Sequence, residues 1–397
     1  MIYALRISGK LLRACDALGF SCDNAAMMKT AAALPARRLA SLHRELLGWY
    51  RAHRRDLPWR HSHDPYRIWV AEIMLQQTRI AAVLPYYDGF LKNFPSLHAL
   101  ARARESEVLR CWAGLGYYSR ARNLHRAARE IAADYAGHFP NDLDSALALP
   151  GIGQYTAAAI LSIAFNAPLA ALDGNVARVL ARLFAIRGDL RAPAKWKRLA
   201  AIAQQMVPGN SAGDWNQALM ELGETICTPR SPQCARCPVA THCQARSLNI
   251  TEQLPAPRRK PKVVRVRIAA AVLVDPRGRT LLTKLPGAHD AVIFSGLWQF
   301  PALAISSHTG RAEAELRSYL RSSMALASDA FAPLPPVTHT VTYRQITIAP
   351  FLVRVKALPH FPGYRSAALK TSTALAASSA TKKIARAALQ ALFEGRQ

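Results

Sequence analysis

Two segments in the middle of the chain constrain its fold most strongly. The first, LPGIGQYTAAAI from Leu149 to Ile160, places two glycines directly before a run of good helix formers. Glycine allows a positive φ and a close approach of the backbone to a partner, and the exposed N–H groups of the following helix suit a phosphate. We therefore expect Gly151 and Gly153 to form a hairpin that grips a nucleic-acid backbone. An ordinary packing corner between two helices is the alternative.

The second segment is LDGNVARVLARLF, from Leu172 to Phe184. Asp173 lies between an apolar residue and Gly174, so we expect it on a tight turn where a helix begins. Its ordinary role there is an N-cap. The other interpretation is a carboxylate directed at a positive charge that develops during a reaction.

Net charge indicates the class of partner. The 397 residues carry 52 Lys and Arg against 25 Asp and Glu, a formal charge of +27, and the excess is spread along the chain. Chains this basic usually bind a polyanion. No apolar run approaches the ~20 residues needed to cross a bilayer, so nucleic acid is favoured over a membrane.

A third segment, DPYRIWVAEIMLQQTRI, reads as a buried helix that contains one carboxylate, Glu72. A lone Glu in an apolar run is costly unless it is paired or catalytic. Gln76 lies four residues on and shares its helix face, and Gln77 and Thr78 extend toward the helix end. A buried ion pair with an arginine is the alternative role of Glu72.

Another glycine turn occurs in WAGLGYYSRARNLHRAA, from Trp112 to Ala128. Tyr117 and Tyr118 follow the glycines, and a basic stripe formed by Arg120, Arg122 and Arg126 comes next. Aromatic side chains beside a basic stripe suit wedging between bases and holding phosphates. Alternatively, the tyrosines belong to the core.

Four of the seven cysteines fall within seventeen residues, at Cys227, Cys234, Cys237 and Cys243. An odd count with one tight cluster indicates a metal site in a reducing compartment. Four thiolates can hold either zinc or an iron–sulfur cluster, and the spacing leaves both open.

The chain also shows its domain boundaries. Residues 1–37 lack the features of a signal peptide and read as a non-functional extension or a misassigned start. Helical periodicity covers 38–245, and a basic, Pro-rich linker is expected over 246–263. Alternating strand patterns follow in 264–397, with a turn at Asp275–Gly278 and two strands between His339 and Val355.

The motifs LPWR, WVAEIMLQQT, GLGYYSRARNLH, LPGIGQYTAAAI and LDGNVARVLAR, together with the cysteine spacing, occur in one order over Leu39–Ala245. In this the chain resembles the MutY family of adenine DNA glycosylases, in the endonuclease III-like, helix–hairpin–helix superfamily. The resemblance implies an all-α, two-lobed glycosylase domain with a 4Fe–4S cluster in the loop 227–243. It also implies a smaller α+β, Nudix-like domain at the C-terminus.

The resemblance assigns roles to single residues. Glu72 is implied as the general acid that protonates adenine, and Asp173 as the carboxylate that stabilises the sugar cation, with Tyr155 and Asn175 beside them. An apolar setting would keep Glu72 protonated, and a solvated turn would keep Asp173 ionised. The pocket for the flipped base is implied at Trp59, Arg60 and Glu221. Residues that fill or wedge the duplex are implied at Gln76, Gln77 and Tyr117.

The C-terminal domain of that family reads 8-oxoguanine opposite the adenine. Where the family usually has Phe-Ser-His, this chain has Val341, Thr342 and Tyr343. Thr342 keeps a hydroxyl and Tyr343 adds one, so we expect lesion reading to persist with weaker stacking.

The expected function is therefore a monofunctional adenine DNA glycosylase that acts on duplex DNA with 8-oxoguanine:A or G:A mispairs. Endonuclease III-like lyases need a lysine in the helix after the hairpin, where this chain has Tyr155. We further expect a monomer in the bacterial cytoplasm, associated with the nucleoid. The alternatives are a lyase acting on damaged pyrimidines and a non-catalytic iron–sulfur DNA-binding protein.

Overall fold

The structure is a computed structural model. It describes residues 35–256, 263–284, 297–305, 311–328, 330–341, 343–375 and 377–394, so the expected extension over 1–37 lies outside it apart from 35–37. The chain divides into two compact units, Met1–Ala103 with Ser119–Arg259, and Arg104–Tyr118 with Lys260–Gln397. No helix among the described residues is long and apolar enough to cross a membrane.

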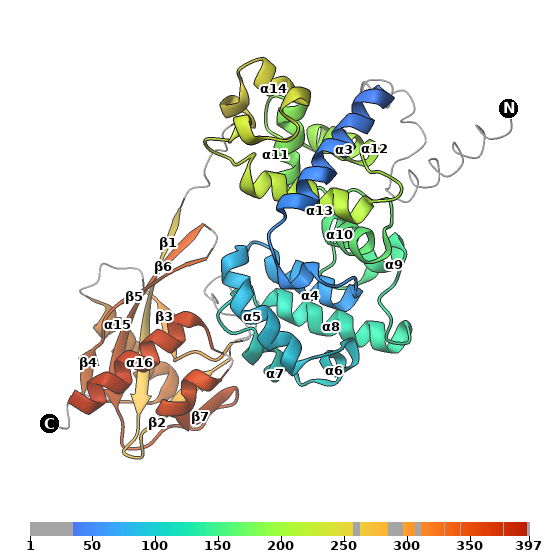
Figure 1. The fold of residues 1–397 in the computed structure, drawn as a ribbon. Helices are drawn as coiled ribbons and strands as arrows, with labels where there is room; N and C mark the ends of the chain where they lie inside the picture. The colour runs from blue at the N-terminus through green and yellow to red at the C-terminus, as the bar shows by residue number, and fades with distance from the viewer. Residues whose placement is uncertain are drawn as a thin grey trace. The chain divides into compact units, whose positions relative to one another are not determined.

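One group of helices in the first unit shares a single hydrophobic core (Figure 1). The amphipathic helix α3 buries Leu42, Leu46 and Tyr50 in this core. The cluster cysteines Cys227, Cys237 and Cys243 pack against the same core. The helices of the group are α3 (Ala36–His53), α11 (Gly174–Leu183), α12 (Pro193–Gln205) and α13 (Ala212–Thr225).

The second group surrounds α4 (Pro65–Leu75), which contacts α5, α8 and α10. Helix α10 also contacts α13, and Gly213 makes this approach possible: a Cβ there would lie 2.6 Å from the carbonyl oxygen of Ser162. The first unit is therefore two-lobed, as expected. The other helices here are α5 (Ile80–Asn93), α6 (Leu97–Arg102), α8 (Ser119–Asp134), α9 (Leu143–Ala148) and α10 (Gln154–Phe165).

The cysteine loop is built from short helical turns, η3 (Cys234–Arg236), η4 (Ala240–His242) and α14 (Gln244–Ser247). The chain then continues through η5 (Thr251–Gln253) and buries Ile250 and Leu254 beside Ala245. Residues 246–256 therefore belong to the first unit and not to a linker. The linker prediction rested on the Pro and Arg content of this stretch and overlooked its apolar residues, which pack together in the first unit. Residues 257–262 lie outside the description.

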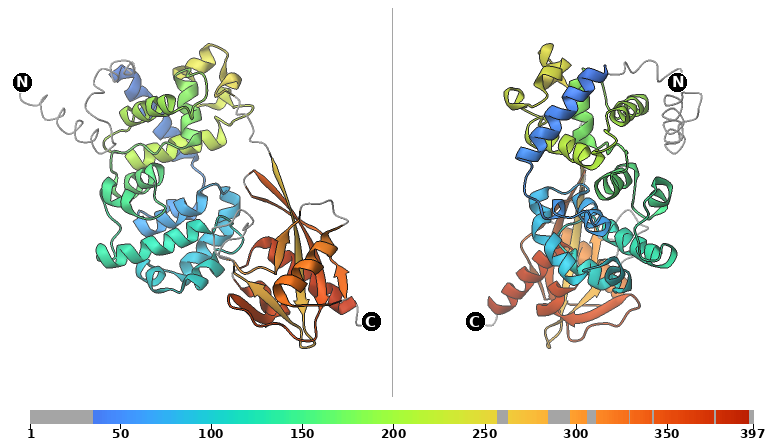
Figure 2. Two further views of the ribbon diagram at one scale, coloured as in Figure 1. Left: turned by 180° about the vertical axis from the view of Figure 1, so that it is seen from behind. Right: turned by 45° about the vertical axis from the view of Figure 1, so that its right-hand side comes forward.

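The second unit contains α7 (Glu105–Cys111) and a seven-stranded mixed sheet in its described part (Figure 2). The strand order is β4-β6-β1-β2-β7, with β3 paired to β1 and β5 to β6. Strands β1 and β6 run parallel from Val264↔Arg344 to Val274↔Arg354. The strands are β1 (Val264–Val274), β2 (Arg279–Thr283), β3 (Ala302–Ala304), β4 (Phe331–Pro333), β5 (Val337–Val341), β6 (Arg344–Arg354) and β7 (Tyr364–Ala368).

Side-chain alternation along β1 explains why two helices cover this sheet. Val272 and Val274 lie in one core with Ile384 of α16 (Ser379–Glu394), whereas Ala271 and Leu273 lie in a second core with Leu316 of α15 (Ala312–Met324). Successive strand residues point to opposite faces, so a strand buried on both faces needs a cover on each. This α/β/α sandwich confirms the expected α+β, Nudix-like class. The turn between β1 and β2 and the β5–β6 pair are confirmed as well.

Candidate active site

Helix α4 places Glu72 inside the protein. Asp64 accepts a hydrogen bond from the N–H of Tyr66 at 2.9 Å, and Pro65 occupies the first helical position, so the start of the helix is fixed. Eight of the nine positions from Tyr66 to Met74 are buried, all except Arg67, so burial extends around the helix. A helix that is apolar all round packs in the interior of the protein. Because Glu72 is part of this helix, it is buried as well.

Burial is the main influence on the pKa of Glu72, which is only 7% exposed. It raises the pKa of Glu72 to about 7, against the lowering effect of a hydrogen bond with Tyr155, and the nearby carboxylate of Asp173 adds to the rise. The oxygen Oε2 of Glu72 has no hydrogen-bond partner. The alternative of a buried ion pair with arginine is not found for Glu72 among the described residues. The direction of this pKa shift is the one expected for a carboxyl in an apolar setting, and a protonated Glu72 stays a prediction.

Asp173 begins helix α11 and accepts the N–H of Val176 at 2.7 Å. We had expected a solvated turn, whereas Asp173 is half-buried. Burial raises the pKa of this carboxyl, while backbone N–H bonds from Val176 and Asn175 act to lower it. The positive end of the helix dipole also favours the charged form.

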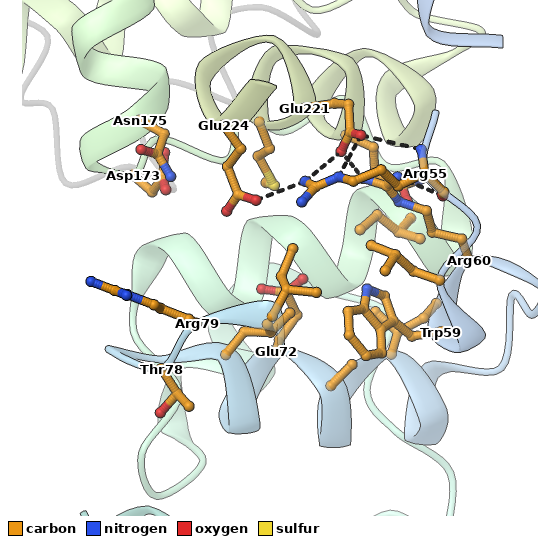
Figure 3. Close-up of a pocket in the computed structure, with 18 of the residues that line it drawn as sticks. Arg55, Trp59, Arg60, Glu72, Thr78, Arg79, Asp173, Asn175, Glu221 and Glu224 are labelled. Carbon is orange, nitrogen blue, oxygen red and sulfur yellow. Dashed lines mark hydrogen bonds and ion pairs between the residues drawn. The ribbon is translucent and has the colours of Figure 1, made fainter. Parts of the chain in front are cut away.

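A cavity of about 400 Å³ brings these residues together (Figure 3). Its wall is formed by η2 (Pro58–Arg60), α4, α10, the start of α11, and α13. Figure 3 shows Glu72 on α4 across the cavity from Glu221 and Glu224, with Asp173 and Asn175 to one side. The expected site residues on this wall are Trp59, Arg60, Glu72, Gln77, Tyr155, Asp173, Asn175 and Glu221.

Glu221 anchors two arginines at the edge of the cavity. Its carboxylate pairs with Nε of Arg55 and Nη2 of Arg60, both at 2.7 Å, and its side chain is 1% exposed. Burial alone would raise the pKa of Glu221, but bonds to Arg55 and Arg60 outweigh it and lower the pKa to about 2. Glu221 is therefore charged, and it fixes Arg60 beside the cavity.

The sequence interpretation missed further cavity residues on α13. Gln217, Met220, Glu221 and Glu224 are spaced at i, i+3, i+4 and i+7, so they form one stripe of the helix that faces the cavity. Glu224 also pairs with Arg55 at 2.7 Å. Extending the helical period from Glu221 could have found them. Arg55 itself offers no such signal, because it lies in an irregular segment after α3.

The residues expected to contact DNA are placed in different surroundings. Gly151 has φ +80° as expected, whereas Gly153 has φ −99° and caps α10. Gln76 donates to Thr156 at 3.2 Å, and the exposed Gln77 has φ +55°.

Tyr117 belongs to the second unit, is 38% exposed and has φ +47°. It is therefore not a core residue. In the lesion-reading segment Tyr343 is 44% exposed, whereas Thr342 and the side chain of Val341 lie outside the description.

The four cysteines form a donor set that fits an iron–sulfur cluster. Burial raises the pKa of the Cys237 thiol to about 12, and the charges of Cys227, Cys243 and Cys234 add to the rise. Arg182 donates to Sγ of Cys227 at 3.3 Å. Among the described residues, no three His, Cys, Asp or Glu side chains are arranged closely enough to hold a metal ion. Mutually close, partly buried thiols need a bound cation to become thiolates together.

Helix α11 also connects the cysteine loop to the turn that holds Asp173. Arg178 donates from Nη2 to Oδ1 of Asn175 at 3.0 Å and from Nε to the carbonyl of Cys227 at 2.9 Å. Arg182, 1% exposed, holds the carbonyl of Thr228 at 2.7 Å and that of Leu254 at 2.8 Å. The start of α11 and the loop are therefore one hydrogen-bonded structure.

A helical hairpin, a carboxylate-lined cavity and a four-cysteine loop define the helix–hairpin–helix class of base-excision proteins. Residues 70–205 match the family described as HhH-GPD superfamily base excision DNA repair protein, and residues 227–243 match the iron-sulfur binding domain of endonuclease III. The match of the cysteine loop to an iron–sulfur binding domain decides between the two metals that the spacing left open, in favour of a 4Fe–4S cluster.

Curated relatives narrow the class. The chain is 46% identical over 218 residues to the human adenine DNA glycosylase, covering 53% of this chain and 40% of the human protein. It is 33% identical over 393 residues to the mouse adenine DNA glycosylase, covering 86% of this chain and 76% of that protein. A solved thermostable thymine-DNA glycosylase aligns with 32% identity and a TM-score of 0.49 over 53% of this chain and 98% of that one. The chain belongs to the adenine DNA glycosylase family of DNA repair enzymes.

Proposed function

We propose that the chain excises adenine mispaired with 8-oxoguanine or G in duplex DNA. The observation that carries this is the cavity lined by both Glu72 and Asp173, in which burial raises the pKa of Glu72 to about 7 and Asp173 accepts a backbone N–H at the start of α11. Two carboxyl groups with opposite protonation states suit cleavage of a glycosidic bond.

In the proposed reaction, Glu72 donates its proton to the departing base while the bond between the base nitrogen and C1′ breaks. The bonding electron pair leaves with adenine, and the charge of Asp173 stabilises the positive sugar until water adds to C1′. Tyr155 keeps its proton, because burial and the charge of Glu72 raise its pKa well above the usual value. Its hydroxyl donates to Sδ of Met220 at 3.6 Å and also interacts with the carboxyl of Glu72, which it would help to orient.

The same cavity supports a monofunctional enzyme. Among the described residues on its wall there is no lysine, and a Schiff-base lyase needs an amine nucleophile. Borohydride trapping on the 8-oxoguanine:A duplex should yield no covalent adduct. Trapping as efficient as that of a true lyase would favour the pyrimidine lyase instead.

We assign lesion reading to the second unit through Thr342 and Tyr343, and the protein to the bacterial cytoplasm as a monomer on the nucleoid. The test compares 8-oxoguanine:A with G:A duplexes for the full chain and for a chain ending after Ala256, which keeps the buried Leu254. The shorter chain should still release adenine but lose most of its preference for the lesion. Salt must be fixed, because binding by so basic a protein depends on it. An unchanged ratio would remove lesion reading from the second unit.

A further inference from the structure

Arg120 does not lie in an exposed basic stripe, as the sequence suggested, but is 8% exposed in the first turn of α8. Its Nη1 donates to the carbonyls of Ile73 and Met74 at 2.9 and 2.8 Å and also to that of Gln76. Its Nη2 donates to Oγ1 of Thr78 at 3.0 Å. Two of the four acceptors lie in the last turn of α4, one is at its C-cap Gln76, and one is two residues beyond the cap.

These contacts meet a specific need of α4. The last four carbonyls of a helix have no partner within it and carry partial negative charge, and the last turn of α4 has no basic residue of its own. Glu72 begins that turn. The guanidinium of Arg120 therefore supplies from α8 both the missing donors and the missing positive charge.

The contacts also bracket Gln77. Arg120 holds the residue before it, through the carbonyl of Gln76, and the residue after it, through the hydroxyl of Thr78. Gln77 itself has φ +55°, is exposed and lies on the cavity wall. A left-handed conformation at a non-glycine residue persists only where its surroundings hold it.

We propose that Arg120 is a positioning residue that holds Gln77 in its left-handed conformation. The side chain of Gln77 can then enter the duplex as the target base leaves the stack. This rests on the proposed function. Arg120 is not among the residues of the cavity wall and acts through the backbone around Gln77. Only a forked, multi-donor side chain can serve acceptors on both sides of one residue.

The test measures base unstacking separately from chemistry. The protein binds an 8-oxoguanine duplex with 2-aminopurine in place of adenine, and 2-aminopurine fluorescence reports unstacking while anisotropy reports binding. Arg120→Lys keeps the charge and loses the fork, so unstacking should fall about tenfold with little change in Kd. Arg126→Lys is the matched control on the same helix, because the Arg126 side chain is 65% exposed. It should behave as wild type.

Two further variants decide whether Arg120 acts through Gln77. Gln77→Gly accepts the left-handed conformation without strain and has no side chain to insert. The double variant Arg120→Lys, Gln77→Gly should unstack no worse than Gln77→Gly alone, since the effects share one route. If Arg120→Lys does not fold, Thr78→Val removes one of the same contacts and should lower unstacking several-fold.

Wild-type unstacking by Arg120→Lys, or additive losses in the double variant, would overturn the inference. A wild-type protein that unstacks the base but releases no adenine would overturn the proposed function and leave the role of Arg120 standing.

Discussion

The carboxylate of Asp173 accepts the backbone N–H of Val176 at 2.7 Å. By this bond it caps α11, and by its position it lines the same cavity as Glu72. The two roles use the carboxylate differently, because a cap needs only an acceptor whereas a cation partner needs a negative charge.

Asp173→Asn should therefore separate the roles. Asn caps helices about as well as Asp, so the free energy of unfolding should change by less than about 0.5 kcal/mol. Single-turnover release should fall roughly 100-fold or more, because the charge is lost. Asp142→Asn is the matched control, since Asp142 caps α9 by the same bond to Ser145 at 2.9 Å. Equal rates for Asp173→Asn and wild type would contradict the assignment.

The raised pKa of Glu72 predicts a dependence of stability on pH. Its pKa is 4.5 ordinarily and about 7 in the fold, so its contribution is fully present below pH 4.5 and is lost as the pH rises through 7. The difference corresponds to about 3 kcal/mol. Glu72→Gln should match wild type in unfolding free energy at pH 4 and exceed it by up to that amount at pH 8. Denaturant titrations giving the same difference at both pH values would argue against a buried, protonated Glu72.

The two glutamates that pair with Arg55 should differ in their effect on stability. Glu221→Gln leaves the buried Arg60 without its carboxylate and should cost about 3–5 kcal/mol. Glu224→Gln, at a side chain 36% exposed, should cost about 0–1 kcal/mol. Chemical denaturation of both variants at neutral pH measures their free energies of unfolding. Similar decreases for the two variants would show that burial of the glutamate does not decide the cost.

Ser replacement of Cys237 should remove the visible absorbance of the cluster and weaken DNA binding more than it slows chemistry in the bound complex. Cys237 packs against the core shared with α11, so losing the cluster disturbs the loop next to the arginines Arg230 and Arg236. Cys111→Ser, on α7, is the control and should keep the absorbance. Stoichiometric zinc without iron in anaerobic, iron-replete preparations would reject the 4Fe–4S assignment.

Local sequence patterns predicted most of what lies within single elements. The buried helix around Glu72, the glycine turn at Gly151 and the strand pairs of the second unit follow from periodicity and turn chemistry. Helix α15 was not predicted, although its buried residues Ala312, Leu316, Leu320 and Met324 recur at every fourth position. Strand β7 was not predicted either, because its five residues do not alternate between buried and exposed.

Contacts between elements could not be predicted in this way. Arg120 was expected in a basic stripe that holds phosphates, yet it is buried and donates hydrogen bonds to the carbonyls at the end of α4. Asp173 was expected on a solvated turn, yet it is half-buried in a cavity wall that α13 also forms. In each case a partner distant in sequence decides the environment, and no spacing within the chain encodes that partner.

The most direct test is single-turnover adenine release from an 8-oxoguanine:A duplex by wild type and by Glu72→Gln, with binding measured in parallel. We expect wild type to release adenine without cutting the strand, and Glu72→Gln to bind the duplex normally but release almost none, because only the transferable proton is lost. Near-wild-type release by Glu72→Gln, or no release by the wild-type protein, would contradict the account.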